Sequence, residues 1–138
     1  MTDNRKFNGQ IDAFVRKSET RMIAVVRQSA HDVFEDAQVS TAKGGRMRVD
    51  TGFLRNSGQV SLTGLPSGPE RLEEGMPIPA NIKGSTVSWQ PRRGPIWFGW
   101  TASYARAREY HDGFMVEAAK KWQQFINKNT AEIKRRLR

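Results

Sequence analysis

Apolar residues recur at steps of three and four over the first forty residues, which is the spacing of one face of an α-helix. The pattern runs from about residue 8 to residue 39, and charged and polar residues fill the opposite face. Its apolar positions are Ile11, Phe14, Val15, Met22, Val25, Val26, Val33 and Ala37. Because each helical residue adds 1.5 Å, we predict a helix roughly 40 Å or more long. A helix of that length should project from so short a chain or pack on a neighbouring subunit.

The middle of the chain alternates between apolar and polar residues, the spacing typical of β-strands. We predict strands at residues 58–63, 85–90 and 95–103, with a short hairpin turn at 92–94 between the second and the third. In the third strand Phe98 and Trp100 should face one way and Trp97 the other. Both of its faces are partly apolar, so both are expected to be covered.

Two segments without a periodic pattern separate these elements. Gly44 and Gly45 should end the first helix and form a flexible joint. Residues 64–84 contain four of the six prolines and four glycines, which predicts a long loop. This loop is expected either to be a floppy surface loop or to be an arm that orders only against another subunit.

A second helical pattern occupies residues 112–138, with Asp112 as the expected N-cap. The predicted fold class is therefore α+β, with a small antiparallel sheet packed against a long N-terminal helix and a C-terminal helix. The 138 residues fit a single domain, in which 1–40 is the long helix, 41–111 holds the sheet, and 112–138 is the final helix.

The stretch VDTGFLRNSG, residues 49–58, contains the Asp-Thr-Gly triplet of aspartic proteases. Those enzymes need two carboxylates that share a proton at the end of a buried apolar strand, whereas this triplet follows a polar, basic stretch. We instead expect Asp50 or Thr51 to cap a single helical turn over residues 52–56. Phe53 and Leu54 should anchor that turn on the core. Asp50 is also a candidate partner for Arg55.

A formal net charge of +9 favours a polyanionic partner, nucleic acid first, although basic residues also simply solvate a surface. The basic residues form separate clusters, one of them at the C-terminus. The candidate DNA-facing residues are Lys43, Arg46, Arg48, Arg92 and Arg93. The absence of cysteine excludes disulfides and thiolate metal sites, and the two histidines, His31 and His111, lie far apart in sequence. No cofactor is expected, and no apolar run reaches the ~20 residues of a membrane span.

Two segments together resemble a bacteriophage family. VDTGFLRNSG is similar to a V-D-T-G-x-L-R-x-S element, and SYARAREYHDGF, residues 103–114, is similar to a Y-A-x-x-x-E-aromatic-Gly element. Both are found in head–tail joining or tail-completion proteins of long-tailed phages, of the minor tail protein Z type. The family often has Gly-Thr where this chain has His111 and Asp112. The motif and structural residues of these two segments are Thr51, Gly52, Phe53, Leu54, Tyr104, Glu109, Tyr110 and Phe114.

The resemblance implies a structural, non-enzymatic subunit of the virion neck or tail, made in the cytoplasm of the bacterial host. It implies a homo-oligomeric ring, with six copies expected, that contacts other neck and tail proteins and has genomic DNA passing through its lumen. The candidate subunit-interface residues are Asp50, Arg55, Pro66, Pro69, Met76, Ile78, Trp97 and Trp100. The alternatives are a sequence-independent nucleic-acid-binding protein and, less favoured, an aspartic-type protease.

Overall fold

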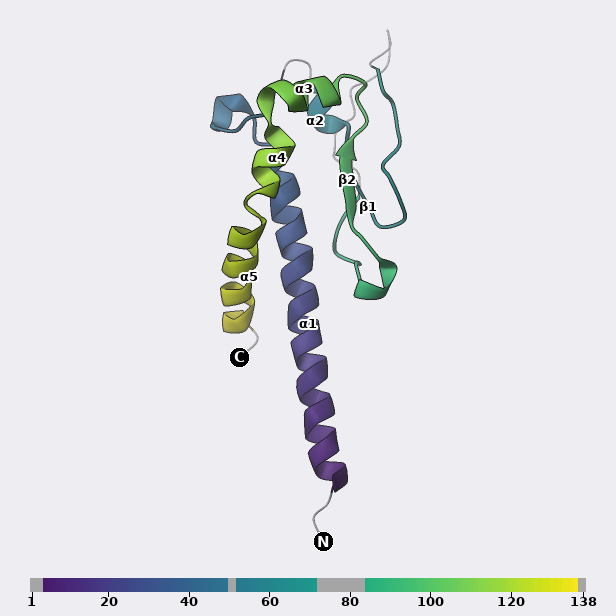
Figure 1. The fold of residues 1–138 in the computed structure, drawn as a ribbon, viewed down its shortest axis with the longest axis vertical. Coiled ribbons are helices and arrows are strands. Elements are labelled where there is room, and N and C mark those ends of the chain that lie inside the picture. Colours follow the sequence, from purple (N-terminus) through teal and green to yellow (C-terminus); the bar gives the residue numbers. More distant parts are fainter. Residues whose placement is uncertain (1–3, 50–51, 72–83, 137–138) are drawn as a thin grey trace.

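A computed structural model of the chain describes residues 4–49, 52–71 and 84–136. The described residues form mostly helices and a two-strand antiparallel sheet, and the long N-terminal helix contacts the C-terminal helix (Figure 1). The predicted fold class is therefore confirmed.

The first helix, α1 (Asn4–Ala37), contains the predicted apolar pattern within one uninterrupted element. Its C-terminal half lies antiparallel to α5 (Trp122–Arg136) (Figure 1). Its N-terminal part extends well past the end of α5, and residues 8–20 are exposed on every face of the helix. The prediction that part of this helix projects is thus confirmed.

Helix α1 ends at Ala37, earlier in the chain than Gly44 and Gly45, which were predicted to end it. Met47 donates its backbone N–H to the Val39 carbonyl at 3.3 Å, which closes a loop that contains the 3-10 turn Thr41–Lys43. Gly44 follows this turn with φ of +86°, a left-handed conformation that favours glycine. The loop returns Met47 to the core, where its side chain is fully buried.

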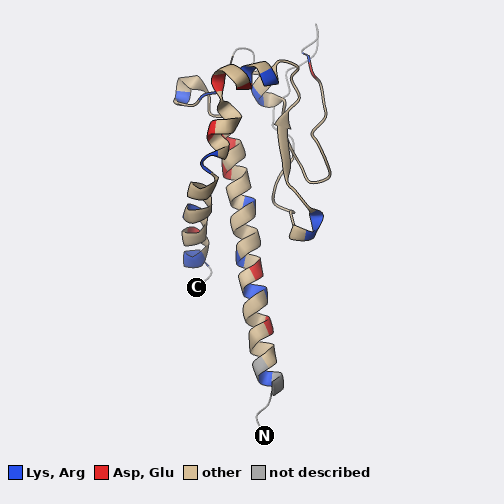
Figure 2. Ribbon diagram, in the orientation of Figure 1, with Lys and Arg blue, Asp and Glu red and all other residues tan. Residues whose placement is uncertain are grey.

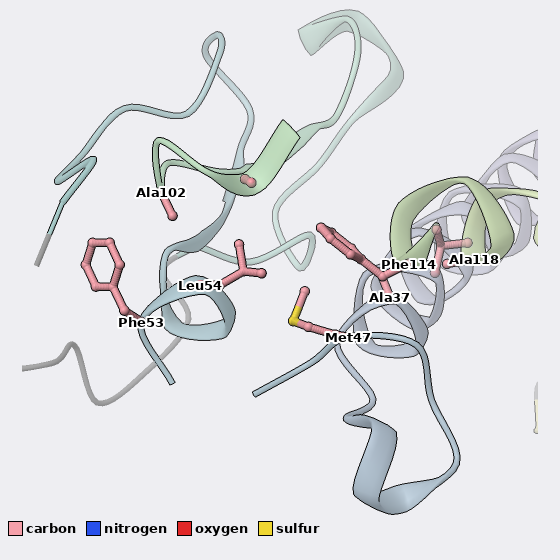
Figure 3. Packing of buried hydrophobic residues seen from close by; sticks show 9 residues of the cluster. Ala37, Met47, Phe53, Leu54, Ala102, Phe114 and Ala118 are labelled. Atoms are coloured by element: carbon pink, nitrogen blue, oxygen red, sulfur yellow. The ribbon is translucent and has the colours of Figure 1, made fainter. Parts of the chain in front are cut away.

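The hydrophobic core gathers side chains from segments far apart in the sequence (Figure 3). Phe53 and Leu54 lie in α2 (Phe53–Asn56), and both are buried, so the predicted anchoring of this turn on the core is confirmed. The other members of the buried cluster are Val33, Ala37, Met47, Ala102, Ala105, Phe114 and Ala118. Alanines allow backbones to approach closely, and here they come from α1, from the segment after the second strand, and from the helices at residues 105–112 and 114–119.

The sheet pairs β1 (Gly58–Ser61) with β2 (Trp97–Trp100), so that Gly58 lies opposite Trp100 and Ser61 opposite Trp97. Both strands are shorter than predicted. Phe98 and Trp100 point to α1, where their ring centroids lie 5.6 and 5.4 Å from that of Phe34. These ring contacts join the sheet to the long helix.

The strand predicted at residues 85–90 is wrong. Thr86 is buried and its hydroxyl donates to the Arg27 carbonyl at 2.9 Å, while Val87 on the same stretch is 74% exposed. The Val87 N–H is bonded to the Ser85 hydroxyl at 3.1 Å and the Trp89 N–H to the Thr86 carbonyl at 3.1 Å. These local bonds satisfy the backbone in a turn, so no ladder forms. The hairpin turn predicted at 92–94 is also wrong, because a 3-10 helix spans Pro91–Arg93.

The single helix predicted for residues 112–138 is two helices, α4 (Phe114–Ala119) and α5, and the sequence did not predict the helix before them, α3 (Ala105–Asp112). Gly113, with φ of +67°, separates α3 from α4. Asp112 is the last residue of α3, so its predicted role as an N-cap is wrong. Glu109 performs a related task instead, because its carboxylate accepts the backbone N–H groups of Met115 at 2.7 Å and Val116 at 3.0 Å.

Candidate anion-binding cleft

The two segments that carry the phage resemblance, about fifty residues apart in sequence, meet in space. α2 and the start of α3 lie together at the end of the molecule opposite the N-terminus (Figure 1). Between them is a cleft of about 520 Å³. Its lining residues are Arg48, Val49, Gly52, Phe53, Leu54, Arg55, Arg71, Ser103, Tyr104 and Arg108.

The local structure of α2 positions one wall of this cleft. Gly52 is the N-cap residue with φ of +87°, a conformation that the absence of a side chain permits. The Ser57 hydroxyl donates to the Leu54 carbonyl at 2.7 Å and closes the short turn. With Phe53 and Leu54 held in the core, Arg55 is left exposed at the cleft. The predicted caps, Asp50 and Thr51, lie outside the described residues.

Four arginines line the cleft, and the carboxylate of Asp112 forms ion pairs with two of them. Asp112, whose side chain is only 5% exposed, lies 3.4 Å from Arg48 Nε and 3.8 Å from Arg108 Nε. Among the described residues, Arg55 and Arg71 form no ion pair. The described part of the cleft therefore carries an excess of positive charge.

This lining suits an anionic group attached to an apolar one. A guanidinium presents a planar fork of N–H donors that matches a carboxylate or a phosphate. Val49 and Tyr104, which are 44% and 42% exposed, add apolar surface between the arginines. Tyr104 lies against Phe53, with 6.5 Å between the ring centroids. The arrangement can bind an acidic side chain together with an apolar neighbour.

The structure does not bring the five predicted DNA-facing residues together. Arg48 lines the cleft, whereas Lys43 and Arg46 are exposed on the loop after α1. Arg92 and Arg93 are exposed in the 3-10 helix before β2, at the other end of the sheet (Figure 2). These residues therefore provide three separate basic surfaces.

The predicted interface residues are also spread over the molecule. Arg55 lines the cleft, Pro66 is half-buried near Gly99, and Pro69 is exposed. Trp97 is half-buried, and the Trp100 ring packs inside the chain, 4.9 Å from the Phe114 ring centroid. The remaining candidates, Asp50, Met76 and Ile78, lie outside the described residues.

The described part of the predicted loop contacts its own sheet. The Thr101 hydroxyl donates to the Pro69 carbonyl at 2.8 Å, and the Gln59 amide donates to the Ser67 carbonyl at 2.7 Å. The Ser103 N–H donates to the Glu70 carbonyl at 2.7 Å. Residues 64–71 are thus held within the subunit, and these bonds bring Arg71 to the cleft.

Sequence reasoning missed Arg71 and Arg108 as members of this cluster. Arg108 and Asp112 are four residues apart, a spacing at which side chains on a helix meet, so that pair was detectable. Arg71 lies within the proline-rich loop 64–84, which has no periodic pattern, so the sequence did not indicate where its side chain would lie. Of the other motif residues, Phe114 is buried in the core and Tyr110 is 86% exposed.

A second, smaller cleft of about 220 Å³ lies between α4 and the loop after α1. Glu117 lines it and accepts a hydrogen bond from Lys120 Nζ at 3.0 Å. That hydrogen bond, together with the charges of Lys120, Arg46 and Lys121, lowers the pKa of the Glu117 carboxyl. Lys121 also forms an ion pair with Asp36 of α1 at 3.1 Å. Acidic and basic groups alternate here, so this cleft has no comparable excess of charge.

The described residues contain no group of three or more histidine, aspartate or glutamate side chains placed to hold a metal ion. Within the same residues, no helix has the length and apolar content to cross a bilayer. Comparison of the chain with protein-family models, curated proteins and solved structures finds no match.

Proposed function

We propose that this protein is a non-catalytic structural subunit of the neck or tail of a long-tailed bacteriophage. It joins other copies in a ring, with six expected, through which genomic DNA passes. The observation that carries the proposal is the meeting of the two phage-like segments at one arginine-lined cleft. Segments that resemble the same family and meet at one surface are expected to serve one purpose.

In this proposal the cleft receives an acidic segment of a neighbouring subunit or neck protein. The exposed apolar surface of Val49 and Tyr104 beside the arginines is suited to a protein segment that carries both acidic and apolar side chains. The exposed basic residues outside the cleft, among them Lys43, Arg92 and Arg93, are the candidates to face DNA in the lumen.

The test is assembly of the full chain with the neck and tail proteins of its phage, measured by native mass spectrometry and electron microscopy. The double variant Arg55→Glu with Arg71→Glu reverses the two arginines that form no ion pair with a described residue. We expect it to fold normally and to lose assembly. The matched control is Arg106→Glu with Lys128→Glu, which makes the same change of charge at exposed positions outside the cleft.

Two results would argue against this function. If the cleft variant assembles as well as the control variant, the cleft has no role in assembly. Tight DNA binding by the isolated chain, weakening steeply as salt is raised, would favour a sequence-independent nucleic-acid-binding protein instead.

A further inference from the structure

The projecting part of α1 carries an uncovered row of large apolar side chains. Ile11 is 45% exposed, Phe14 70%, Val15 44% and Met22 54%. Ser18 lies within the same row, because residues three, four and seven apart share one face of a helix. An apolar row of this length, whose side chains the described residues leave largely exposed, is typical of an interaction surface.

This row continues the face of α1 that is buried farther along. Ile11, Met22 and Val33 are eleven residues apart, as are Val15, Val26 and Ala37, and an eleven-residue repeat keeps positions on one side of a long helix. Val33 and Ala37 are buried in the core. The same face is therefore covered in one half of the helix and bare in the other.

An apolar groove joins the two halves. It has a volume of about 290 Å³ and lies between α1 and the last turns of α5, where Met22, Val25 and Val26 face Ile126 and Ile133. The bare row leads directly into this groove. A helix laid along the row would thus extend the packing that α5 begins.

The charges beside the row are arranged asymmetrically. At about 100° per residue, Asp12 and Glu19 lie to one side of the row, with Arg16 farther round on that side, while Lys17 and Arg21 lie to the other. Basic and acidic residues alternate along this part of the helix in Figure 2. Among the described residues, neither Lys17 nor Glu19 forms an ion pair.

We infer that residues 8–22 of α1 pair with the same segment of a second copy of this chain, with the two helices parallel. Each helix then covers the apolar row of the other. In a parallel pair about a two-fold axis, the acidic flank of each helix faces the basic flank of its partner on both sides. An antiparallel pair would place like flanks together. Measured along the helix axis, Glu19 of one copy in the parallel pair lies within roughly 3 Å of Lys17 and of Arg21 of the other copy.

The inference does not rest on the proposed function. The row and the arginine cleft lie at opposite ends of the molecule (Figure 1), so substitutions in one leave the other intact. The interface is small, at the low end of those that hold specific complexes, so the pairing should depend on concentration.

Sedimentation equilibrium of the full chain over a wide range of concentration tests the pairing. We expect a monomer–dimer equilibrium for the natural chain and a monomer for Ile11→Ser with Phe14→Ser. Ala13→Ser, on the opposite face of the same segment, is the matched control and should dimerise as the natural chain does. A natural chain that stays monomeric throughout this range would overturn the inference.

The absence of cysteine allows the orientation to be tested by cross-linking. Ile11→Cys and Ser18→Cys, made separately, lie about 10 Å apart along the helix. In a parallel pair each cysteine meets its own counterpart, so both variants should form disulfide-linked dimers on oxidation. Thr20→Cys, on the opposite face, should not. Equal cross-linking of all three, or of one row position alone, would contradict a parallel pair.

Charge reversal tests the flanks. Lys17→Glu and Glu19→Lys should each weaken dimerisation by about two- to tenfold, because each creates like-charge contacts. An equimolar mixture of the two variants should recover the natural affinity, since the heterodimer restores opposite charges on both sides. Loss of affinity that mixing leaves unchanged would refute the flank pairing.

Discussion

Residues 8–22 and residues 23–37 of α1 carry the same spacing of apolar residues but lie in opposite surroundings. In the second half Val25, Val33 and Phe34 are buried by α5, the sheet and the core. In the first half Ile11 and Phe14 are exposed. The spacing thus determines that a helix forms and which face is apolar, whereas the coverage of that face depends on segments from elsewhere in the chain, or from another chain.

Contacts from distant residues hold the second half in place. Phe34 lies against Phe98 and Trp100 of the sheet. Ser29, which is fully buried, accepts a hydrogen bond from the Asn129 amide of α5 at 3.0 Å. In the first half the described side-chain bonds are local, such as that of the Thr20 hydroxyl to the Arg16 carbonyl at 2.9 Å. The two halves should therefore respond very differently to matched substitutions.

The largest difference is expected for two phenylalanines of the same helix. Phe34→Ala leaves a cavity against two aromatic rings and should lower the free energy of unfolding by about 3–5 kcal/mol. Phe14→Ala should change it by less than about 0.5 kcal/mol, because that ring is 70% exposed. Urea denaturation at a concentration where the chain is monomeric measures both. Similar losses at the two positions would show that the first half is covered within the subunit.

Ser18 and Ser29 make a second matched pair, since they are eleven residues apart on the same face. Ser29→Ala removes the hydroxyl that accepts from Asn129 and should cost about 1 kcal/mol of unfolding free energy. The loss is moderate because Asn129 keeps its bond to Asp32 at 2.9 Å. Ser18→Ala should be neutral or slightly stabilising, because alanine favours helices. A clear loss of stability for Ser18→Ala would contradict its placement on a bare surface.

Gly9 allows the first half to be changed alone. A Cβ atom at this position would meet nothing within 4 Å. Gly9→Ala should stabilise the local helix by about 1 kcal/mol and slow amide hydrogen exchange over the first half, without changing global unfolding. Gly58→Ala is the contrasting change, because its Cβ would lie 2.8 Å from Gln38 Oε1 and 3.0 Å from the Phe34 ring. It should lower global stability, and a neutral result would contradict the packing of β1 on α1.

Periodicity predicted the helices and the general fold because it reports on one face of one element. It failed at residues 85–90, where Ser85 and Thr86 bond locally and to Arg27 rather than to a strand partner. It also missed α3, which ends before Gly113, and ran α4 and α5 together, because the break at residues 120–121 does not interrupt the apolar spacing. Hydrogen bonds of hydroxyls and the conformation of a single glycine are not visible in a pattern of apolar positions.

The cleft was predictable only in part. The short motifs identified Gly52, Phe53, Leu54 and Tyr104, and the structure brings all four to one site. The charge clusters were misleading, because residues close in sequence, such as Arg46 and Arg48, lie on different surfaces. The arginines that surround the cleft come from four separate segments. Only tertiary structure places such residues together.

The smallest expected effect is the pH dependence of stability that Glu117 causes. This residue lies in α4, which contacts α1. The pKa of Glu117 is lowered in the folded protein, first by the Lys120 hydrogen bond. A lowered pKa means that the carboxylate stabilises the fold above the pKa of the unfolded chain, and that this contribution disappears as pH falls through the folded pKa. Glu117→Gln should therefore be slightly less stable than the natural chain near neutral pH and equally stable in acid below about pH 3. The difference in melting temperature between the two proteins, followed from pH 7 downward, measures it, and the side chain's exposure keeps it small. A difference that persists unchanged in acid would mean that Glu117 acts through packing and not through its charge.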